Sequence, residues 1–209
     1  MRSLSTFVFL AVLLSACSST PKTSYYTLSA APLPSAAATS SGTSVMVGPV
    51  SLPDSLDQPL LVVQSGNNQV SMSEYHRWAG SLKGDIGRVI AVNLAHDLGT
   101  ARVWSYAQSI QTNADYQVLI DVQSFDAKLG DAVELDVLWT ILPAASKATP
   151  GMTTSAKSTP RPSADPGSNQ KSGRTLVHEP VSGAGFESLV AAQSRALVRV
   201  SADIARAIR

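Results

Sequence analysis

The stretch Tyr116-Gln117-Val118-Leu119-Ile120-Asp121-Val122-Gln123-Ser124-Phe125 alternates apolar and polar side chains, with four apolar or aromatic residues on one face. Alternation with a period of two is typical of a β-strand that buries one face. Residues 133–142 repeat the pattern, and Lys128-Leu129-Gly130-Asp131 between them is typical of a turn. These segments therefore predict two neighbouring strands joined by a short turn.

The C-terminal stretch, residues 186–208, has a helical period instead. Its apolar side chains fall on one face and its charged side chains on the opposite face, which predicts an amphipathic helix packed on a sheet. The apolar set is Phe186, Leu189, Val190, Leu197, Val200, Ile204 and Ile208. A membrane-surface helix is the alternative, but the width of the apolar stripe favours packing.

A second helix is predicted over residues 73–97, with Ser73 as N-cap, Glu74 in the first turn and Gly99 after its end. Its apolar stripe contains Trp78, Leu82, Ile86, Val89, Ile90, Leu94 and Leu98. Three glycines interrupt the pattern at positions 80, 84 and 87, and each costs about 1 kcal/mol relative to alanine in a helix. Either a neighbour packs closely against them or the helix is broken early.

Shorter segments complete the pattern. Strands are predicted at residues 25–28, 44–50, 60–64, 69–72, 101–106 and 174–179, with a bulge or sheet edge at Gly48-Pro49 and a hairpin turn at residues 66–68. Residues 30–43 are rich in Ala, Ser and Pro and predict a linker. Residues 143–173 lack large apolar side chains and predict a disordered insertion. The fold class is therefore α/β, a mixed sheet flanked by helices in a single domain.

The N-terminal stretch predicts a lipoprotein signal peptide over residues 1–16. Arg2 provides the positive end, residues 7–14 the apolar core, and Leu14-Ser15-Ala16-Cys17 a lipobox with cleavage between Ala16 and Cys17. The apolar run is shorter than the roughly twenty residues that a transmembrane helix needs. Cys17 is the only cysteine, so it cannot form an internal disulfide, and we expect it to carry the covalent lipid. An ordinary signal peptide with a spectator cysteine is the alternative.

A lipid on Cys17 would place the domain close to a membrane. The tether, residues 17–24, spans at most roughly 23 Å when extended. In bacterial lipoproteins that this N-terminus resembles, aspartate after the cysteine favours the inner membrane. Ser18 stands there instead and indicates the outer membrane, periplasmic face.

Charge and motifs exclude several function classes. The mature chain of 193 residues has fifteen basic and fifteen acidic residues, which argues against nucleic acid as a partner. The three histidines, at 76, 96 and 178, lie far apart without metal-ligand spacing, so we expect no metal and no cofactor beyond the lipid. Catalytic motifs such as GxSxG are missing from the sequence, so we expect no catalytic residues and no enzyme.

Two motifs remain as candidates for partner contact or for structure. Asp54 and Asp57 lie in a turn bracketed by Pro53 and Pro59, with Leu56 between them, where carboxylates usually cap backbone amides. Arg77 and Trp78 form the second motif. Trp78 fits a buried position, and Arg77 is either a solvated charge or an ion-pair donor.

The order of these motifs resembles the ABC-type transport auxiliary lipoprotein family, the PqiC-like lipoproteins. The resemblance rests on Tyr25-Tyr26-Thr27-Leu28 after the lipobox, on residues 47–54 and 56–59, on His76-Arg77-Trp78-Ala79, on Asp115-Tyr116, and on the final helix. It covers residues 25–209 apart from the insertion.

The resemblance implies a non-enzymatic, lipid-anchored outer-membrane subunit of an MCE/ABC-type lipid transport system. The implied partners are a periplasmic MCE-domain protein and the ABC or permease components, with the subunit as a homo-oligomer. Two rivals stay open: a periplasmic lipoprotein that binds a lipid or solute itself, and a cell-envelope hydrolase.

Overall fold

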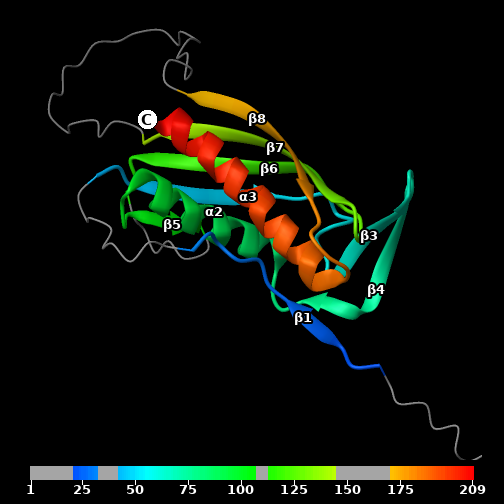
Figure 1. Cartoon of the computed structure of the whole chain (residues 1–209). Helices are drawn as coiled ribbons and strands as arrows, with labels where there is room; N and C mark the ends of the chain where they lie inside the picture. The colour runs from blue at the N-terminus through cyan, green and yellow to red at the C-terminus, as the bar shows by residue number, and fades with distance from the viewer. Residues whose placement is uncertain (1–20, 33–41, 107–112, 145–169) are drawn as a thin grey trace, which may run out of the picture.

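The computed structural model describes residues 21–32, 42–106, 113–144 and 170–209, and its larger element is a five-stranded sheet (Figure 1). The strand order is β5-β2-β6-β7-β8. These strands are β2 (Val45–Ser51), β5 (Val103–Ser105), β6 (Tyr116–Ala127), β7 (Ala132–Pro143) and β8 (Lys171–Pro180). β2 runs parallel to β5 and β6, whereas β6, β7 and β8 are antiparallel. The predicted mixed sheet and the α/β class are confirmed.

Two helices cover one face of this sheet. α2 (Leu82–Leu98) contacts β2 and β5, and α3 (Phe186–Ile208) contacts β7 and β8, and the helices also contact each other (Figure 1). The alternation in β6 and β7 points Val118, Ile120 and Val137 into the core beneath the helices. The helices therefore share a face rather than flanking the sheet on both sides.

A second, three-stranded sheet packs at one end of the molecule. It has the order β1-β4-β3, formed by β1 (Ser24–Tyr26), β3 (Leu60–Gly66) and β4 (Gln69–Trp78). The hairpin of β3 and β4 was predicted from the sequence, but its separation from the main sheet was not. β1 adds to the edge of β4 in parallel, with Ser24 opposite His76 and Tyr26 opposite Trp78.

The predicted start of the first long helix is wrong. Residues 73–78 belong to β4, because β1 and β3 both pair with this strand, and α2 begins at Leu82 with Ser81 as its N-cap. Gly99, in the left-handed conformation with φ 65°, ends the helix where the sequence indicated. Of the three glycines, Gly80 precedes the helix and Gly87 packs against Val50, where an added Cβ would lie 3.4 Å from its side chain.

Other boundaries shift by a few residues. The pairing of β2 with β6 is irregular between Val47 and Val50, which confirms the expected bulge at Gly48-Pro49. β7 extends to Pro143 and β8 begins at Lys171, so both ends of the predicted insertion are strand, and residues 145–169 lie outside the described residues. The signal peptide and Cys17 also lie outside them. Within the described part of the chain, neither helix is long and apolar enough to cross a membrane.

Candidate functional site

The chain that follows the predicted lipid anchor joins the folded body at β1. The Ala79 amide donates to the Tyr26 carbonyl at 2.8 Å, and the Trp78 amide donates to the Pro59 carbonyl at 2.8 Å. Trp78 is buried, as its apolar side chain predicts, although it lies on a strand rather than on a helix. Two of the motifs singled out from the sequence therefore meet here and hold the strand nearest the anchor.

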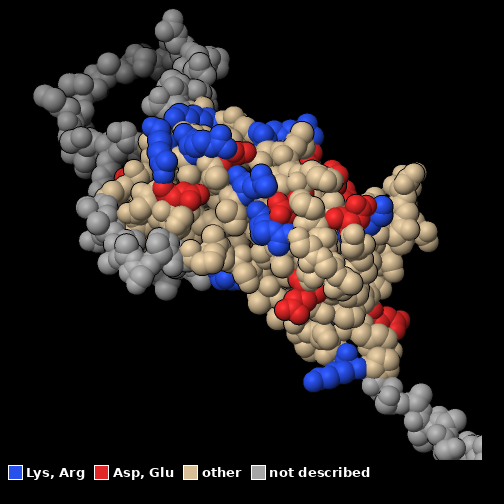
Figure 2. Space-filling model, in the orientation of Figure 1, with Lys and Arg blue, Asp and Glu red and all other residues tan. Residues whose placement is uncertain are grey.

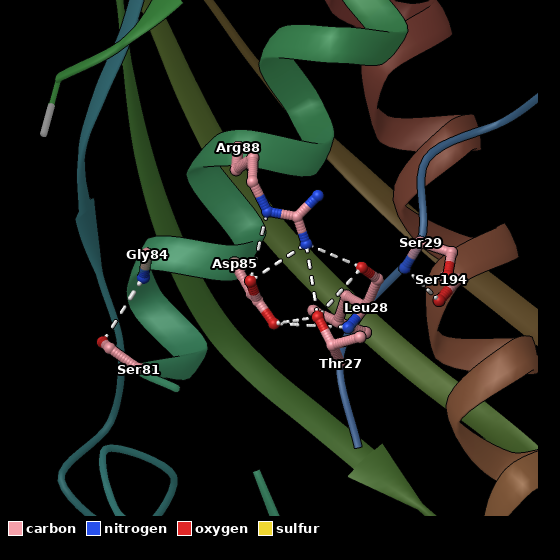
Figure 3. A network of polar contacts seen from close by, with 8 residues as sticks. All are labelled: Thr27, Leu28, Ser29, Ser81, Gly84, Asp85, Arg88 and Ser194. Atoms are coloured by element: carbon pink, nitrogen blue, oxygen red, sulfur yellow. Dashed lines mark hydrogen bonds and ion pairs between the residues drawn. The ribbon is translucent and has the colours of Figure 1, made fainter. Parts of the chain in front are cut away.

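Residues after β1 are bound to the first turns of α2 by a carboxylate and a guanidinium (Figure 3). Asp85 accepts from the Thr27 hydroxyl at 2.9 Å and from the Leu28 amide at 3.3 Å. Arg88 donates to the Leu28 carbonyl at 2.7 Å and pairs with Asp85 at 2.9 Å. Both the amide and the carbonyl of Leu28 are thus satisfied by α2, and the Leu28 side chain is buried in the hydrophobic core.

The next residues alternate between the two helices. The Ser29 amide donates to the Ser194 hydroxyl of α3 at 3.1 Å, and the Ala31 amide donates to the Asn93 side-chain carbonyl of α2 at 2.9 Å. Asn93 in turn donates to the Ser201 hydroxyl of α3 at 3.4 Å. We call the contacts of residues 27–31 with Asp85, Arg88, Asn93 and Ser194 the clamp.

Aromatic rings join β1, β4 and the start of α3. The Tyr26 hydroxyl lies 2.7 Å from Nδ1 of His76, and the His76 ring stacks on Phe186 with centroids 3.8 Å apart. Tyr26 also contacts Phe186, at 6.3 Å between centroids. His76 therefore has a packing role, and the described residues contain no cluster of His, Cys, Asp and Glu side chains fit to hold a metal ion.

The Pro53 turn is held by backbone contacts rather than by carboxylate caps. The amides of Leu56 and Asp57 both donate to the Pro53 carbonyl, at 2.9 and 3.2 Å. The Asp57 carboxylate instead pairs with Lys83 of α2 at 2.5 Å. Asp54 is exposed at this turn. The turn is thereby fixed to the start of α2, on the same end of the domain as β1.

Arg77 is exposed on β4, opposite Tyr25 of β1. Its guanidinium donates to the Glu74 carbonyl at 3.4 Å, a contact within its own strand. Arg77 is therefore one of the predicted contact residues that the fold leaves accessible, whereas Trp78 beside it is buried.

A groove of about 790 Å³ lies between the segment after β1 and the first half of α3. Tyr25, Ala30 and Ala31 line one wall and Val190, Ala191 and Val198 the other, with Glu187 and Arg195 as charged lining residues. The walls are mainly apolar side chains and the groove is open to solvent, so it could accept an elongated apolar group.

The comparisons with known proteins agree with this arrangement. A family model described as the ABC-type transport auxiliary lipoprotein component matches residues 26–205, from β1 to near the end of α3. The chain belongs to this family. The match begins in β1, the strand nearest the predicted lipid anchor, and it includes every residue of the clamp.

Solved structures show the same fold for this lipoprotein component. A crystal structure of an uncharacterized protein has 18% identity and a TM-score of 0.65, covering 90% of this chain and 100% of the other. A protein from Xanthomonas campestris has 17% identity and a TM-score of 0.60, covering 87% and 92%. Among curated proteins none matches the chain significantly.

Charged side chains of this auxiliary lipoprotein component gather along α3 and β8 (Figure 2). Arg195 and Arg199 both donate to Glu179 of β8, at 2.6 and 3.2 Å, and Arg174 pairs with Asp136 at 2.5 Å. Burial alone would raise the pKa of the Glu179 carboxyl, but the hydrogen bonds from Arg195 and Arg199 outweigh it and hold this pKa below its ordinary value. The contacts of Arg195 and Arg199 with Glu179 therefore tie α3 to the sheet, and we call them the brace. The Arg174–Asp136 pair joins β8 to β7 within the sheet.

The Asp115 carboxyl, whose pKa is also below its ordinary value, joins the starts of β2 and β6. The side chain and amide of Ser44 donate to Asp115 at 2.6 and 2.8 Å, and these bonds lower the pKa of the Asp115 carboxyl. Asp115 directly precedes β6 and Ser44 directly precedes β2, so their contact holds the two strand starts together. It positions the core strands and lies apart from the groove.

The clamp residues were not predicted as site residues. Asp85 and Arg88 are three residues apart on a helix, a spacing that is usual for surface ion pairs. Asn93, Ser194 and Ser201 gave a usable signal, because they are polar residues on the buried faces of their helices. A buried polar side chain needs a hydrogen-bond partner. Asn93 and Ser194 accept from the Ala31 and Ser29 amides, whereas Ser201 accepts from Asn93.

Proposed function

We propose that the protein is an outer-membrane, lipid-anchored auxiliary subunit of an MCE/ABC-type lipid transport system that docks the periplasmic MCE component. One observation carries the proposal: β1 and the clamp fasten residues 24–31 to β4, α2 and α3. A short tether followed at once by a fixed segment sets both the height and the orientation of the body above the membrane. A docking subunit needs both.

The proposed anchor is a lipid on Cys17, with Ser18 as the address for the outer membrane. Two or more acyl chains make such anchoring stable, at about 0.8 kcal/mol per buried CH₂. The proposed partners are the periplasmic MCE-domain protein and, through it, the ABC and permease components. We also propose a homo-oligomer, which the resemblance to the family implies.

The test is a pull-down of the full-length protein from crosslinked cells. Wild type should return an MCE or ABC component, and Cys17→Ala, exported at equal abundance, should lose both the component and complementation. Ser18→Asp is the matched variant, because it keeps the lipid but changes the membrane address. Full complementation by unlipidated Cys17→Ala would refute the positioning role.

The groove beside β1 favours a second candidate, a periplasmic lipoprotein that binds a lipid or solute in its own domain. Its apolar walls and its volume of about 790 Å³ suit part of a lipid chain. Lipid extracted from purified Cys17→Ala protein, which has no covalent lipid of its own, would support this candidate. Ala191→Trp places a large side chain in the groove and should then release that lipid.

A further inference from the structure

Exposed apolar side chains are concentrated on the small sheet. Of the eight large apolar side chains that are exposed in the described residues, four lie on β1 and β4. They are Tyr25 (66% exposed), Val70 (52%), Met72 (49%) and Tyr75 (38%). Val70 and Met72 are alternate residues of β4 and therefore share one face of the strand, where they form a small exposed apolar surface.

The same strand has an incompletely paired edge. β4 has ten residues, and β1 pairs with only the last three, His76 to Trp78. β3 occupies the opposite edge and pairs regularly with Val70 to Met72, with register shifts on either side of these residues. On the edge that β1 uses, residues 69–75 have no partner strand within the described part of the chain. The hairpin projects from the body away from both helices (Figure 1). Main-chain groups along such an edge are a template for a further strand.

Other sheet edges are shorter or protected. β5 has three residues, and β3 contacts β6. β8 begins with Lys171 and ends with Pro180, and both residues accept or donate hydrogen bonds that tie them to α3. Residues 69–75 contain neither Lys nor Pro, the residues that usually discourage strand addition. Their edge therefore lacks the Lys, Arg and Pro residues that β8 has at Lys171, Arg174 and Pro180.

We propose that residues 69–75 of β4 form a strand-addition site for an extended segment of a partner protein. Main-chain hydrogen bonds would supply affinity, and side chains on alternate positions would supply specificity. The segment should carry alternating apolar residues to cover Val70 and Met72, and a Lys or Arg facing Glu74, the only charged residue of the edge. β1 already uses the same edge in this way. The inference deepens the proposed function and rests on it for the partner being a component of the transport system.

Charge and sequence disfavour two other occupants. Two copies pairing antiparallel about Met72 would place Glu74 of each copy opposite Val70 of the other, so neither carboxylate would face a cationic partner. The tether of the same chain, continued in the register of Tyr26 with Trp78, would place Pro21 opposite Ser73. Proline has no N–H to donate, and Pro21 to Thr23 are not strand.

The test uses hydrogen exchange of the lipidated full-length protein in detergent with two synthetic peptides. The first peptide alternates Val and Thr on both sides of a central Lys. The second has the same sequence except that one Val near the Lys is replaced by Pro. The first peptide, at about ten times its dissociation constant, should slow exchange about tenfold at the alternate amides of residues 69–75 that point to the open edge, and the second should not. Met72→Lys should abolish the protection, whereas Leu176→Lys, at a side chain 71% exposed on β8, should keep it. Glu74→Lys should shift the preference to a peptide with a central Glu.

Three hydrogen-exchange results would overturn the strand-addition site. They are no protection by either peptide, peptide-free protection that rises with protein concentration, and peptide-free protection that is lost on deletion of residues 18–22. The second would assign the edge to another copy and the third to the tether. The proposed function fails separately, when wild type returns no transport component from crosslinked cells. If Met72→Lys returns as much component as wild type, the edge is not the docking contact and the inference is overturned.

Discussion

The Thr27 hydroxyl donates a hydrogen bond to the Asp85 carboxylate at 2.9 Å across 58 residues of sequence. Thr27 directly follows β1, and Asp85 lies in the first turn of α2. The contact therefore joins the membrane-proximal segment expected after Cys17 to the helical layer of the domain. Arg88 closes the arrangement by binding both Asp85 and the Leu28 carbonyl.

Asp85→Ala should loosen the clamp. The change removes the acceptor for Thr27 and for the Leu28 amide and leaves Arg88 without its carboxylate, so the free energy of unfolding should fall by about 2 kcal/mol. Urea unfolding measures the loss, and hydrogen exchange should localise faster exchange to residues 27–31. Asp121→Ala, at an exposed position on β6, is the control and should change neither quantity. Unchanged exchange in residues 27–31 would show that the segment is held without Asp85.

Gly173→Ala should disturb the core at β8. A Cβ at this position would overlap the indole ring of Trp139, whose Nε1 donates to Thr175 at 3.0 Å. Displacing this ring should cost about 1–3 kcal/mol and change the tryptophan fluorescence. Gly80→Ala is a matched control, because an added Cβ there meets no atom within 4 Å. Equal stability of the two variants would contradict the close approach of Trp139 to Gly173.

Periodicity explains which elements could be predicted. Residues 186–208 and 116–125 have one buried face, and burial of one face is what a helical or alternating pattern records. Gly173 was assigned to the insertion because its neighbours are small and polar. In β8 it pairs with Trp139 of β7, and only a residue without a Cβ leaves room for the Trp139 ring. Trp139 lies 34 positions earlier in the sequence, so the neighbours of Gly173 do not reveal this contact.

Long-range pairing explains the main error. Residues 73–78 have a capping serine, an acidic residue and aromatic side chains at helical spacing, all local signals for a helix. β1 and β3 pair on both sides of this segment and make it a strand. The clamp contacts could not be predicted for the same reason, since Asp85 and Asn93 bind Thr27, Leu28 and Ala31 about sixty residues away, and two of these three contacts are to backbone amides. A backbone partner leaves no pattern in the sequence.

Glu179→Gln should weaken the brace between β8 and α3 in a pH-dependent way. The folded pKa of the Glu179 carboxyl is below its ordinary value, so its contribution is present above the unfolded pKa and is lost as the pH falls through the folded pKa. At pH 7 the variant should be less stable by about 1–2 kcal/mol, and the difference should shrink in acid. Thermal unfolding between pH 7 and pH 3 measures it.

Glu134→Gln is the control for the brace. Glu134 pairs with His178 at 2.9 Å, but both side chains are more than half exposed, so the loss should be small. A difference between wild type and Glu179→Gln that is constant across this pH range would contradict the depressed pKa of Glu179.

Replacing residues 145–169 with a four-residue Gly-Ser turn should leave the domain folded. β7 and β8 pair without interruption from Ala132 opposite Pro180 to Ile141 opposite Lys171, so their register does not depend on the replaced residues. A shorter connection has a smaller entropic cost of closure, so the free energy of unfolding should rise by about 1 kcal/mol or stay unchanged. Thermal unfolding and the circular dichroism spectrum check the fold. Loss of complementation by a variant that folds normally would assign these residues a role in transport, and loss of folding would contradict the independence of the β7–β8 pair.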